Sequence, residues 1–277
     1  MAFLNCGPWL AGLLAASTMI SPAVAEEIAP TEAWRGSHRI EACDDQAEFP
    51  PYTYIERVAG VKTDIVTGIS YELLATMLQR RGLSLRITLL PWKRCVEEVR
   101  TGRFHVLLNA TMTPDRAVNY HGVGPHATLW TYYFYSRKLH PDGLAIRTLA
   151  DLRKYRICGM MGYNSEEPYG LPKGFVDQGS SDFGSMIRKV LAGHCDLFNE
   201  SLDVMQGFAK IGRPLLDDPQ LAVKILPPEL KPAEYYFLVS RLHPQGRALA
   251  ELLDSELKQM KASGELKRLR EKFLKSP

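Results

Sequence analysis

One internal duplication constrains the fold of this chain more than any other feature of its sequence. Residues 132–143 read YYFYSRKLHPDG, and residues 235–246 read YYFLVSRLHPQG. Each copy begins with the aromatic residues typical of a buried strand and ends in a Pro-x-Gly turn. Two copies this far apart do not form a solenoid. We expect the chain to leave one lobe at the first copy and to return at the second, with a cleft between the lobes. The alternative is that two similar strands meet in one sheet.

The length and charge of the chain fit this expectation and exclude one class of partner. The 277 residues are enough for two lobes. The 34 Lys and Arg residues nearly balance the 31 Asp and Glu residues, whereas nucleic-acid-binding domains carry a clustered basic excess. We therefore expect no nucleic-acid partner. The basic run LKRLREKFLK near the C-terminus is interpreted as the solvated face of a helix.

The first 25 residues have the composition of a secretory signal peptide. They contain no charged residue, include a short apolar run and end in Ala-Val-Ala before Glu26. A short apolar run followed by small residues at alternate positions is typical of a cleaved signal. We expect residues 1–25 to be the signal peptide and residues 26–37 to be a leader. The mature protein is then exported to the periplasm.

Cysteine usage points the same way. Cys6 would leave with the signal peptide, so four cysteines remain: Cys43, Cys95, Cys158 and Cys195. An even number of cysteines in an exported protein favours disulfides, with three possible pairings. Metal binding is the alternative, but the sequence has no CxxC and no close Cys/His cluster. We expect disulfides and no metal.

Hydrophobic periodicity predicts an α/β lobe in the first half of the chain. A strand from His38 and a helix are followed by a strand over residues 83–90, a helix from Trp92 and a strand over residues 104–108. Strands joined by single helices form βαβ units, so the sheet should be at least partly parallel. The same order restarts after the first crossing, and the segment from Arg247 to the C-terminus is helical.

This topology selects one of the three disulfide pairings. Cys158 and Cys195 lie in two strands joined by one helix, and crossover rules tend to place such strands side by side. Cys43 and Cys95 lie in the first lobe, on the first strand and a nearby helix. We expect the bonds Cys43–Cys95 and Cys158–Cys195, because any other pairing would tie the lobes together.

The most informative polar sequence is NATMTPDR, which begins at Asn109 and follows a predicted strand. Ligand sites in open α/β sheets collect at the carboxyl ends of strands. Arg116 can hold a carboxylate through two parallel hydrogen bonds, and Thr111 can add a donor. The alternative is a helix start with Thr113 as N-cap and Pro114 at the first helical position. Both interpretations can hold at once.

A second polar turn, GYNS at residues 162–165, occupies the matching strand end in the second lobe. Glycine and small polar residues at such a turn allow close approach of a ligand to the backbone. An ordinary turn is the alternative. Phe49 and Trp92 are aromatic residues at strand or loop ends, where they can pack in the core or stack on a ligand.

Four short motifs, in this order of elements, resemble the periplasmic solute-binding proteins of ABC importers. They are FPPY at residues 49–52, the helix-ending Gly102, Thr-x-x-x-x-Arg at residues 111–116 and Gly-x-x-Asp at residues 193–196. The closest branch is the type II, amino-acid-binding group (family 3), over about residues 38–275. The resemblance implies an α/β fold of two lobes, with two hinge crossings and a ligand cleft between them.

With the crossings at the duplicated stretches, the first lobe is expected to comprise residues 38–133 and 239–277, and the second lobe residues 134–238. The resemblance assigns the ligand carboxylate to Arg116 and Thr111. It places Phe49 and Trp92 where aromatic residues sandwich the ligand.

In the second lobe, Tyr163 and Asn164 fall on a Ser/Thr pair that donates to the carboxylate in this family. The family's acidic residue for the ligand ammonium falls on Ser201, with Glu200 directly before it. His105 replaces a common aspartate. Ser201 thus weakens the expectation of a standard α-amino acid as the ligand. With Asn109, these residues complete the expected ligand-binding set.

The resemblance implies a monomeric binding protein with no cofactor and no enzymatic activity. Such a protein captures a small carboxylate-bearing, amino-acid-like solute and delivers it to the membrane permease of an ABC importer. One alternative is a periplasmic enzyme similar to cyclohexadienyl dehydratase, with Glu200 as general acid. Another is the ligand-sensing subunit of a receptor. The sequence contains no Ser-His-Asp arrangement, metal motif or phosphate loop.

Overall fold

The computed structural model describes residues 1–2 and 39–275, and every element from Arg39 onward belongs to one structural unit. The predicted signal peptide, its cleavage site and the leader therefore lie outside the described residues, apart from the first two positions. Within the described residues, no helix is both long and apolar enough to cross a membrane.

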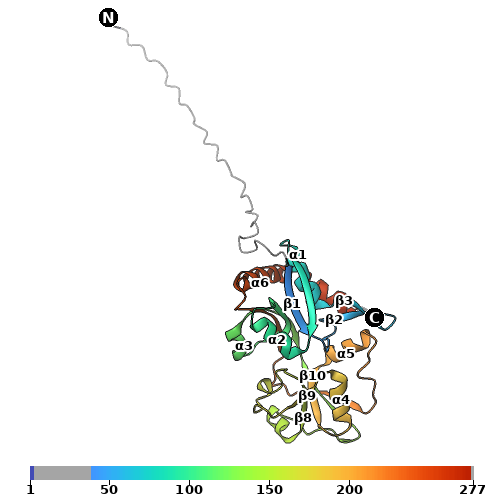
Figure 1. Cartoon of the computed structure of the whole chain (residues 1–277). Helices are drawn as coiled ribbons and strands as arrows, with labels where there is room; N and C mark the ends of the chain where they lie inside the picture. Colours follow the sequence, from blue (N-terminus) through green and yellow to red (C-terminus); the bar gives the residue numbers. More distant parts are fainter. Residues whose placement is uncertain (3–38, 276–277) are drawn as a thin grey trace. The chain divides into compact units, whose positions relative to one another are not determined.

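The first lobe is built on a five-stranded sheet (Figure 1). Its strands are, in spatial order, β4 (Ser84–Leu90), β1 (Arg39–Asp45), β5 (Val106–Thr111), β12 (Ala233–Ser240) and β6 (Tyr120–Leu129). β1 pairs in parallel with β4 and β5, which confirms the predicted βαβ arrangement. β12 returns from the far end of the sequence and pairs antiparallel with both β5 and β6.

Helices cover both faces of this sheet because successive side chains of a strand point to opposite faces. Leu107 of β5 packs with α2 (Trp92–Arg100), whereas the residues on either side of it pack with α1 (Ile69–Gln79) and α6 (Gly246–Ala262). β5 is buried from Val106 to Ala110, and its apolar residues lie on both faces of the sheet.

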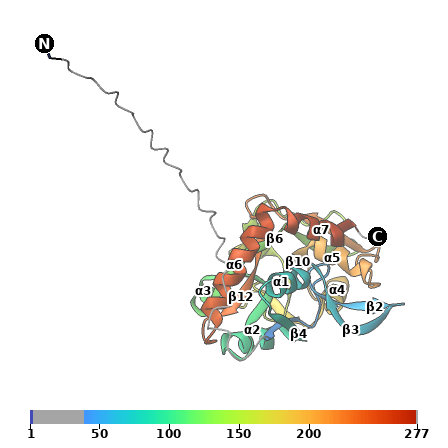
Figure 2. The ribbon, with the colours of Figure 1, turned by 90° about the horizontal axis from the view of Figure 1, so that it is seen from above.

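Three further elements belong to the part of the chain around this lobe. α7 (Glu265–Lys275) contacts both α1 and α6 (Figure 2). α3 (Pro114–Asn119) joins β5 to β6. β2 (Tyr54–Val58) and β3 (Val61–Thr67) form a hairpin outside the main sheet. The sequence analysis did not predict this hairpin, whose tip exposes apolar Val side chains that weaken its alternating pattern.

The second lobe has its own five-stranded sheet. Its strands are, in spatial order, β11 (Leu221–Ile225), β7 (Thr131–Ser136), β10 (Leu197–Ser201), β8 (Ile157–Met160) and β9 (Asp177–Ser180). β8 and β10 are parallel neighbours, as expected for two strands joined by one helix, but the connection between them also contains β9, which the sequence analysis did not predict. That helix, α4 (Phe183–Leu191), packs on β8 and β10, and α5 (Leu202–Lys210) continues directly from β10. Two 3-10 helices, η2 (Leu149–Lys154) and η3 (Glu167–Tyr169), lie in the connections.

The two copies of the duplicated sequence lie in different lobes. The first begins in β7 and the second in β12, so they do not pair in one sheet. The main chain passes between the sheets at Trp130 and at residues 226–232, where β6 pairs with β12 on one side and β7 with β11 on the other. The two crossings are therefore adjacent. They precede the boundaries predicted at 133 and 238 by a few residues, because β12 belongs wholly to the first sheet.

A shared apolar core joins the two lobes on one side of the molecule. Phe134, Phe198 and Phe208 of the second lobe pack in one continuous cluster with Phe49 and Tyr52 of the first. All five side chains are at most 4% exposed. The loop that follows β1 is thus part of the second lobe's core.

Gly207 of α5 marks the closest approach of the lobes within this core. A Cβ atom placed on Gly207 would lie 2.4 Å from the carbonyl oxygen of Pro50. Real Cβ atoms do not approach backbone oxygen so closely, so the contact requires glycine at this position.

Both predicted disulfides are present. Cys43 of β1 is bonded to Cys95 of α2, and Cys158 of β8 is bonded to Cys195, just before β10. The Cα atoms are 5.7 Å apart in each pair. Each bond lies within one lobe, so neither crosses the cleft.

Candidate functional site

Arg116 lies beside the cleft because α3 begins directly after β5. The Thr113 hydroxyl oxygen accepts a 3.1 Å hydrogen bond from the Arg116 N–H, and Pro114 opens the helix, as the helix-start interpretation predicted. The Arg116 guanidinium donates to the carbonyl and hydroxyl oxygens of Thr111 at 2.7 and 3.1 Å and lies 5.8 Å from the centre of the Trp92 ring. Burial lowers the pKa of Arg116, and in the described part of the chain no carboxylate forms an ion pair with it.

Asn109 holds Asp44 in place at the end of β1. The Asn109 amide donates to the Asp44 carboxylate at 2.6 Å and to the Thr53 hydroxyl at 2.8 Å, and it accepts from the Ser70 hydroxyl at 2.6 Å. Both donors of Asn109 are therefore used within the protein. Burial raises the pKa of Asp44 to about 7, although its hydrogen bonds oppose this shift.

Two of the hydrogen bonds that join the lobes involve the GYNS turn. The Tyr163 hydroxyl donates to the Asp45 carboxylate at 2.9 Å, and the Trp92 indole N–H donates to the carbonyl oxygen of Gly162 at 3.1 Å. The rings of Trp92 and Tyr163 also meet edge to face, with their centres 5.5 Å apart. The GYNS turn of the second lobe therefore docks on the first lobe beside Arg116.

These contacts enclose a cavity of about 60 Å³, which we call the inner cavity. Seven of the nine predicted ligand-binding residues line it, all except Glu200 and Ser201. The full lining is Asp44, Phe49, Trp92, Asn109, Thr111, Arg116, Tyr163, Asn164 and Tyr235. The inner cavity thus combines aromatic walls, one cation and one buried carboxylic group.

A larger cavity of about 870 Å³, the outer chamber, shares Thr111, Asn164 and Tyr235 with the inner cavity. Glu200 lines it and accepts a 2.7 Å hydrogen bond from the Ser201 N–H. Ser201 lines neither cavity, and its buried hydroxyl has no hydrogen-bond partner.

Glu200 is a buried carboxyl without a cationic partner. It is 7% exposed, and burial raises its pKa to about 7. Among the described residues, only the Ser201 N–H offsets this effect. At neutral pH Glu200 therefore exists in both its protonated and its ionised form.

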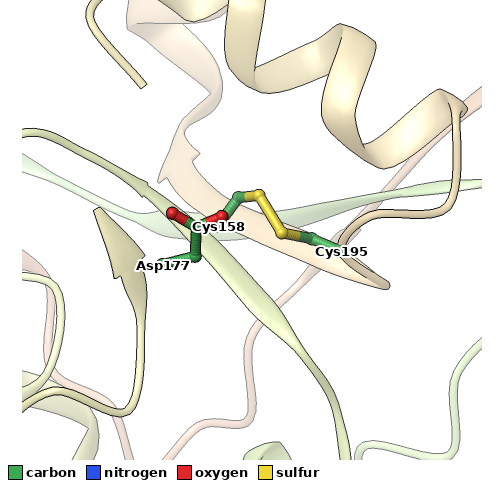
Figure 3. A group of neighbouring side chains, drawn as sticks. All are labelled: Cys158, Asp177 and Cys195. Carbon is green, nitrogen blue, oxygen red and sulfur yellow. A yellow bond between two sulfur atoms is a disulfide. The ribbon is translucent and has the colours of Figure 1, made fainter. Parts of the chain in front are cut away.

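One group of side chains has the composition of a metal site but not its chemistry. Sulfur atoms of Cys158 and Cys195 and a carboxylate oxygen of Asp177 lie within 4.8 Å of one another (Figure 3). The two sulfur atoms form a disulfide, and Asp177 pairs with Lys189 at 2.9 Å. Metals bind the thiolate form of cysteine, so this group does not offer the ligands of a metal site.

The sequence analysis missed two residues of the inner cavity, Asp44 and Tyr235. Asp44 and Asp45 are consecutive acidic residues at the end of a buried strand, which is itself a signal of a site. Tyr235 belongs to the second copy of the duplicated sequence, but that stretch was interpreted only as a hinge strand.

Comparisons with known proteins identify the family and the fold of this chain. The model of the bacterial extracellular solute-binding proteins, family 3, matches residues 43–276. The substrate-binding protein of an amino acid ABC transporter is similar in structure, with a TM-score of 0.66 at 18% identity over 86% of this chain and 100% of that chain. No curated protein sequence matches this chain.

Two further solved structures are similar. One is an amino acid ABC transporter substrate-binding protein from Streptococcus pneumoniae bound to L-arginine, with a TM-score of 0.69 at 19% identity over 86% of this chain and 95% of that chain. The other is an ancestral amino-acid-binding protein described as a precursor of cyclohexadienyl dehydratase, with a TM-score of 0.64 at 18% identity over 86% and 96%. At such identities the structures establish the fold alone. The family match extends over most of the chain, and the chain belongs to the family 3 bacterial extracellular solute-binding proteins.

Proposed function

We propose that this protein captures a small, carboxylate-bearing, amino-acid-like solute between its lobes and delivers it to the permease of an ABC importer. The observation that carries the proposal is Arg116, a partly buried guanidinium that lines the inner cavity and has no carboxylate partner among the described residues. Two of its hydrogen bonds go to Thr111. A guanidinium has five N–H donors, so the remaining donors can bind a ligand carboxylate.

The rest of the inner cavity supports the same solute class. Phe49 and Trp92 supply aromatic walls, and Asn164 adds a polar side chain from the second lobe. Tyr163 closes the cavity by its hydrogen bond to Asp45. A carboxylate bound there would be enclosed by both lobes, which is the arrangement expected for a protein that closes on its ligand.

Family membership supports delivery to a permease, and the expected signal peptide at residues 1–25 supports residence in the periplasm. A monomer is sufficient for this function, because the residues of one chain line both cavities. Binding without chemistry is the simplest use of the cleft, and similar structures are described as substrate-binding proteins of amino acid transporters.

The experiment compares each L-amino acid with the amine that lacks its carboxylate, such as L-arginine with agmatine, by calorimetry on the mature protein. Binding of at least one amino acid, with the corresponding amine about 10-fold weaker or more, would support the proposal. Equal affinity for acid and amine would contradict the role of Arg116. Absence of binding to any carboxylate-bearing solute would overturn the proposed function.

A second candidate function rests on Glu200. A buried carboxyl with a pKa of about 7 can donate a proton at neutral pH, as a general acid must. A dehydratase acting on a cyclohexadienyl carboxylate would use such a group to protonate the hydroxyl, which leaves as water while the C–CO2 bond breaks, CO2 departs and the ring becomes aromatic. Product formation that requires Glu200 and is lost in Glu200→Gln would favour this function over solute binding.

A further inference from the structure

The outer chamber carries more negative than positive charge. Four glutamates line it, and Lys231 is the one lysine or arginine in its lining; the glutamates are Glu167, Glu200, Glu229 and Glu234. The neutral donors Asn164 and Tyr236 hold Glu167 and Glu234. No ion pair joins any of the four to a lysine or arginine within the described chain. A solute that enters this chamber therefore meets a negative potential.

Glu200 is the chamber carboxylate on which burial acts most strongly. It is 7% exposed, and within the described residues it accepts one hydrogen bond, from the Ser201 N–H. Asn199, which also lines the chamber, has both polar atoms of its side chain buried without hydrogen-bond partners. Burial of a carboxylate is costly unless a cation or several donors satisfy it. A ligand cation in the chamber would supply the cationic partner that Glu200 lacks within the described chain.

Tyrosine rings add a second means of binding a cation. Tyr169, Tyr235 and Tyr236 all line the outer chamber. A cation near an aromatic ring face is attracted by the ring quadrupole, and the attraction grows where water is excluded. The chamber thus combines a buried carboxylate with aromatic surface.

The inner cavity has a carboxylate of its own. Asp44 is 1% exposed and lines this cavity together with Arg116. Asp44 accepts hydrogen bonds from the Asp45 N–H, from Asn109 and from Thr53, and the two oxygens of a carboxylate offer about four acceptor sites, which leaves capacity for a ligand. Asp44 can therefore receive a ligand ammonium, the role for which Ser201 has no carboxylate. The inner cavity of about 60 Å³ has room only for a small head group, so the remainder of the ligand extends into the chamber.

We infer that the solute is a dibasic amino acid, with its carboxylate on Arg116, its α-ammonium beside Asp44 and its side-chain cation on Glu200. This inference rests on the proposed function and narrows its substrate class. It differs from that proposal in requiring a second positive charge, at a distance from the carboxylate.

The test uses pairs of amino acids that match in length and differ in charge. L-arginine is compared with L-citrulline, and L-lysine with L-norleucine, by calorimetry at about pH 8, above the pKa of about 7 of Glu200. The cationic member of each pair should bind about 10- to 100-fold more tightly to the wild type. In Glu200→Gln this advantage should fall below about threefold, while the affinity for the neutral member stays the same.

Two further variants separate the roles of the two carboxylates. Glu251→Gln removes the same charge from an exposed position on α6 outside both cavities, and it should keep the full preference for the cation. Asp44→Asn should weaken the binding of L-arginine and that of L-citrulline by the same factor, because both ligands carry the α-ammonium.

The outcomes distinguish this inference from the proposed function. Binding of L-citrulline as tight as that of L-arginine overturns the inference but leaves a carboxylate-binding protein. A preference for the cation that persists unchanged in Glu200→Gln also overturns it. If none of the four amino acids binds but another carboxylate-bearing solute does, only the inference is wrong. If no carboxylate-bearing solute binds, both are wrong.

Discussion

The hydroxyl of Tyr163, in the second lobe, donates a 2.9 Å hydrogen bond to the carboxylate of Asp45, in the first. Asp45 is 5% exposed, and its other oxygen accepts from the N–H of Ala47. Burial raises the pKa of Asp45, and the bond from Tyr163 opposes this shift. The second lobe thus provides a donor that stabilises a charge in the first, and this favours the closed arrangement of the cleft.

Tyr163→Phe should therefore shift the ligand-free protein toward an open form. Loss of a buried donor to a carboxylate should cost the closed form about 1–3 kcal/mol. Small-angle scattering should show a larger radius of gyration for the variant, and saturating ligand should restore a compact form. Tyr71→Phe removes a hydroxyl from α1, outside both cavities, and serves as control. Identical radii for all three proteins, with and without ligand, would argue against a hinge.

Arg116→Ala should abolish most of the affinity for the solute. The variant leaves the ligand carboxylate unpaired in an enclosed cleft. The binding free energy should weaken by about 2–5 kcal/mol, by analogy with buried charge pairs at interfaces. Arg116→Lys should retain only part of the wild-type affinity, because an ammonium cannot reproduce the planar set of donors with which the guanidinium also binds Thr111. Calorimetry on the three proteins measures these differences. Equal affinities would end the assignment of Arg116 as the carboxylate anchor.

Glu200 should make the stability of the ligand-free protein depend on pH. Its pKa is raised from 4.5 to about 7, so the folded protein holds this proton more tightly than the unfolded chain. The resulting stability is fully present below pH 4.5 and is lost as the pH rises through about 7. Glu200→Gln removes this dependence. At about pH 8 the free energy of unfolding of the variant should exceed that of the wild type by about 1–3 kcal/mol, and near pH 5 the gain should be much smaller.

Urea unfolding at both pH values measures this effect. Glu251→Gln changes a residue on the exposed surface of α6. Its free energy of unfolding should differ from that of the wild type by the same small amount at both pH values. A gain for Glu200→Gln that does not change with pH would show that the carboxyl titrates normally in the folded protein.

Gly207→Ala should destabilise the protein, because the added Cβ would lie 2.4 Å from the carbonyl oxygen of Pro50 across the shared core. Overpacking of this kind typically costs about 1–3 kcal/mol. Gly184→Ala in α4 is a matched control, since its Cβ would meet side-chain atoms rather than backbone, at 3.2 Å and beyond. That control should be neutral or slightly stabilising. Thermal unfolding of the two variants decides the matter, and equal midpoints would contradict the close contact.

The sequence predicted the features of this protein that depend on local pattern and on connectivity. Arg116 and Thr111 were located correctly beside a cavity because a strand end fixes where the next residues lie. The disulfides followed from the order of strands and helices. Both predictions required only knowledge of which strands and helices are neighbours.

Features that depend on tertiary packing were not predictable in the same way. Counting along the chain placed Ser201 in the site, whereas the structure places its neighbour Glu200 in the outer chamber. A count along the chain does not show which of two adjacent residues reaches a cavity, because this depends on how the end of the strand packs. Asp44 and Asp45 both lie at a strand end in the sequence. Only the packing shows that Asn109 binds Asp44 and that Tyr163 binds Asp45.

The place of β12 in the first sheet determines the order in which the molecule can assemble. β5 and β6 do not pair with each other, because each forms hydrogen bonds to β12, which lies between them. A growing chain that ends before Ala233 therefore leaves two open strand edges in the first lobe, and open edges can pair with other chains. The second sheet comes from one continuous segment and can form earlier. The lobe that holds the N-terminal strands is thus the last to become complete, because it waits for a strand that is made near the end of synthesis.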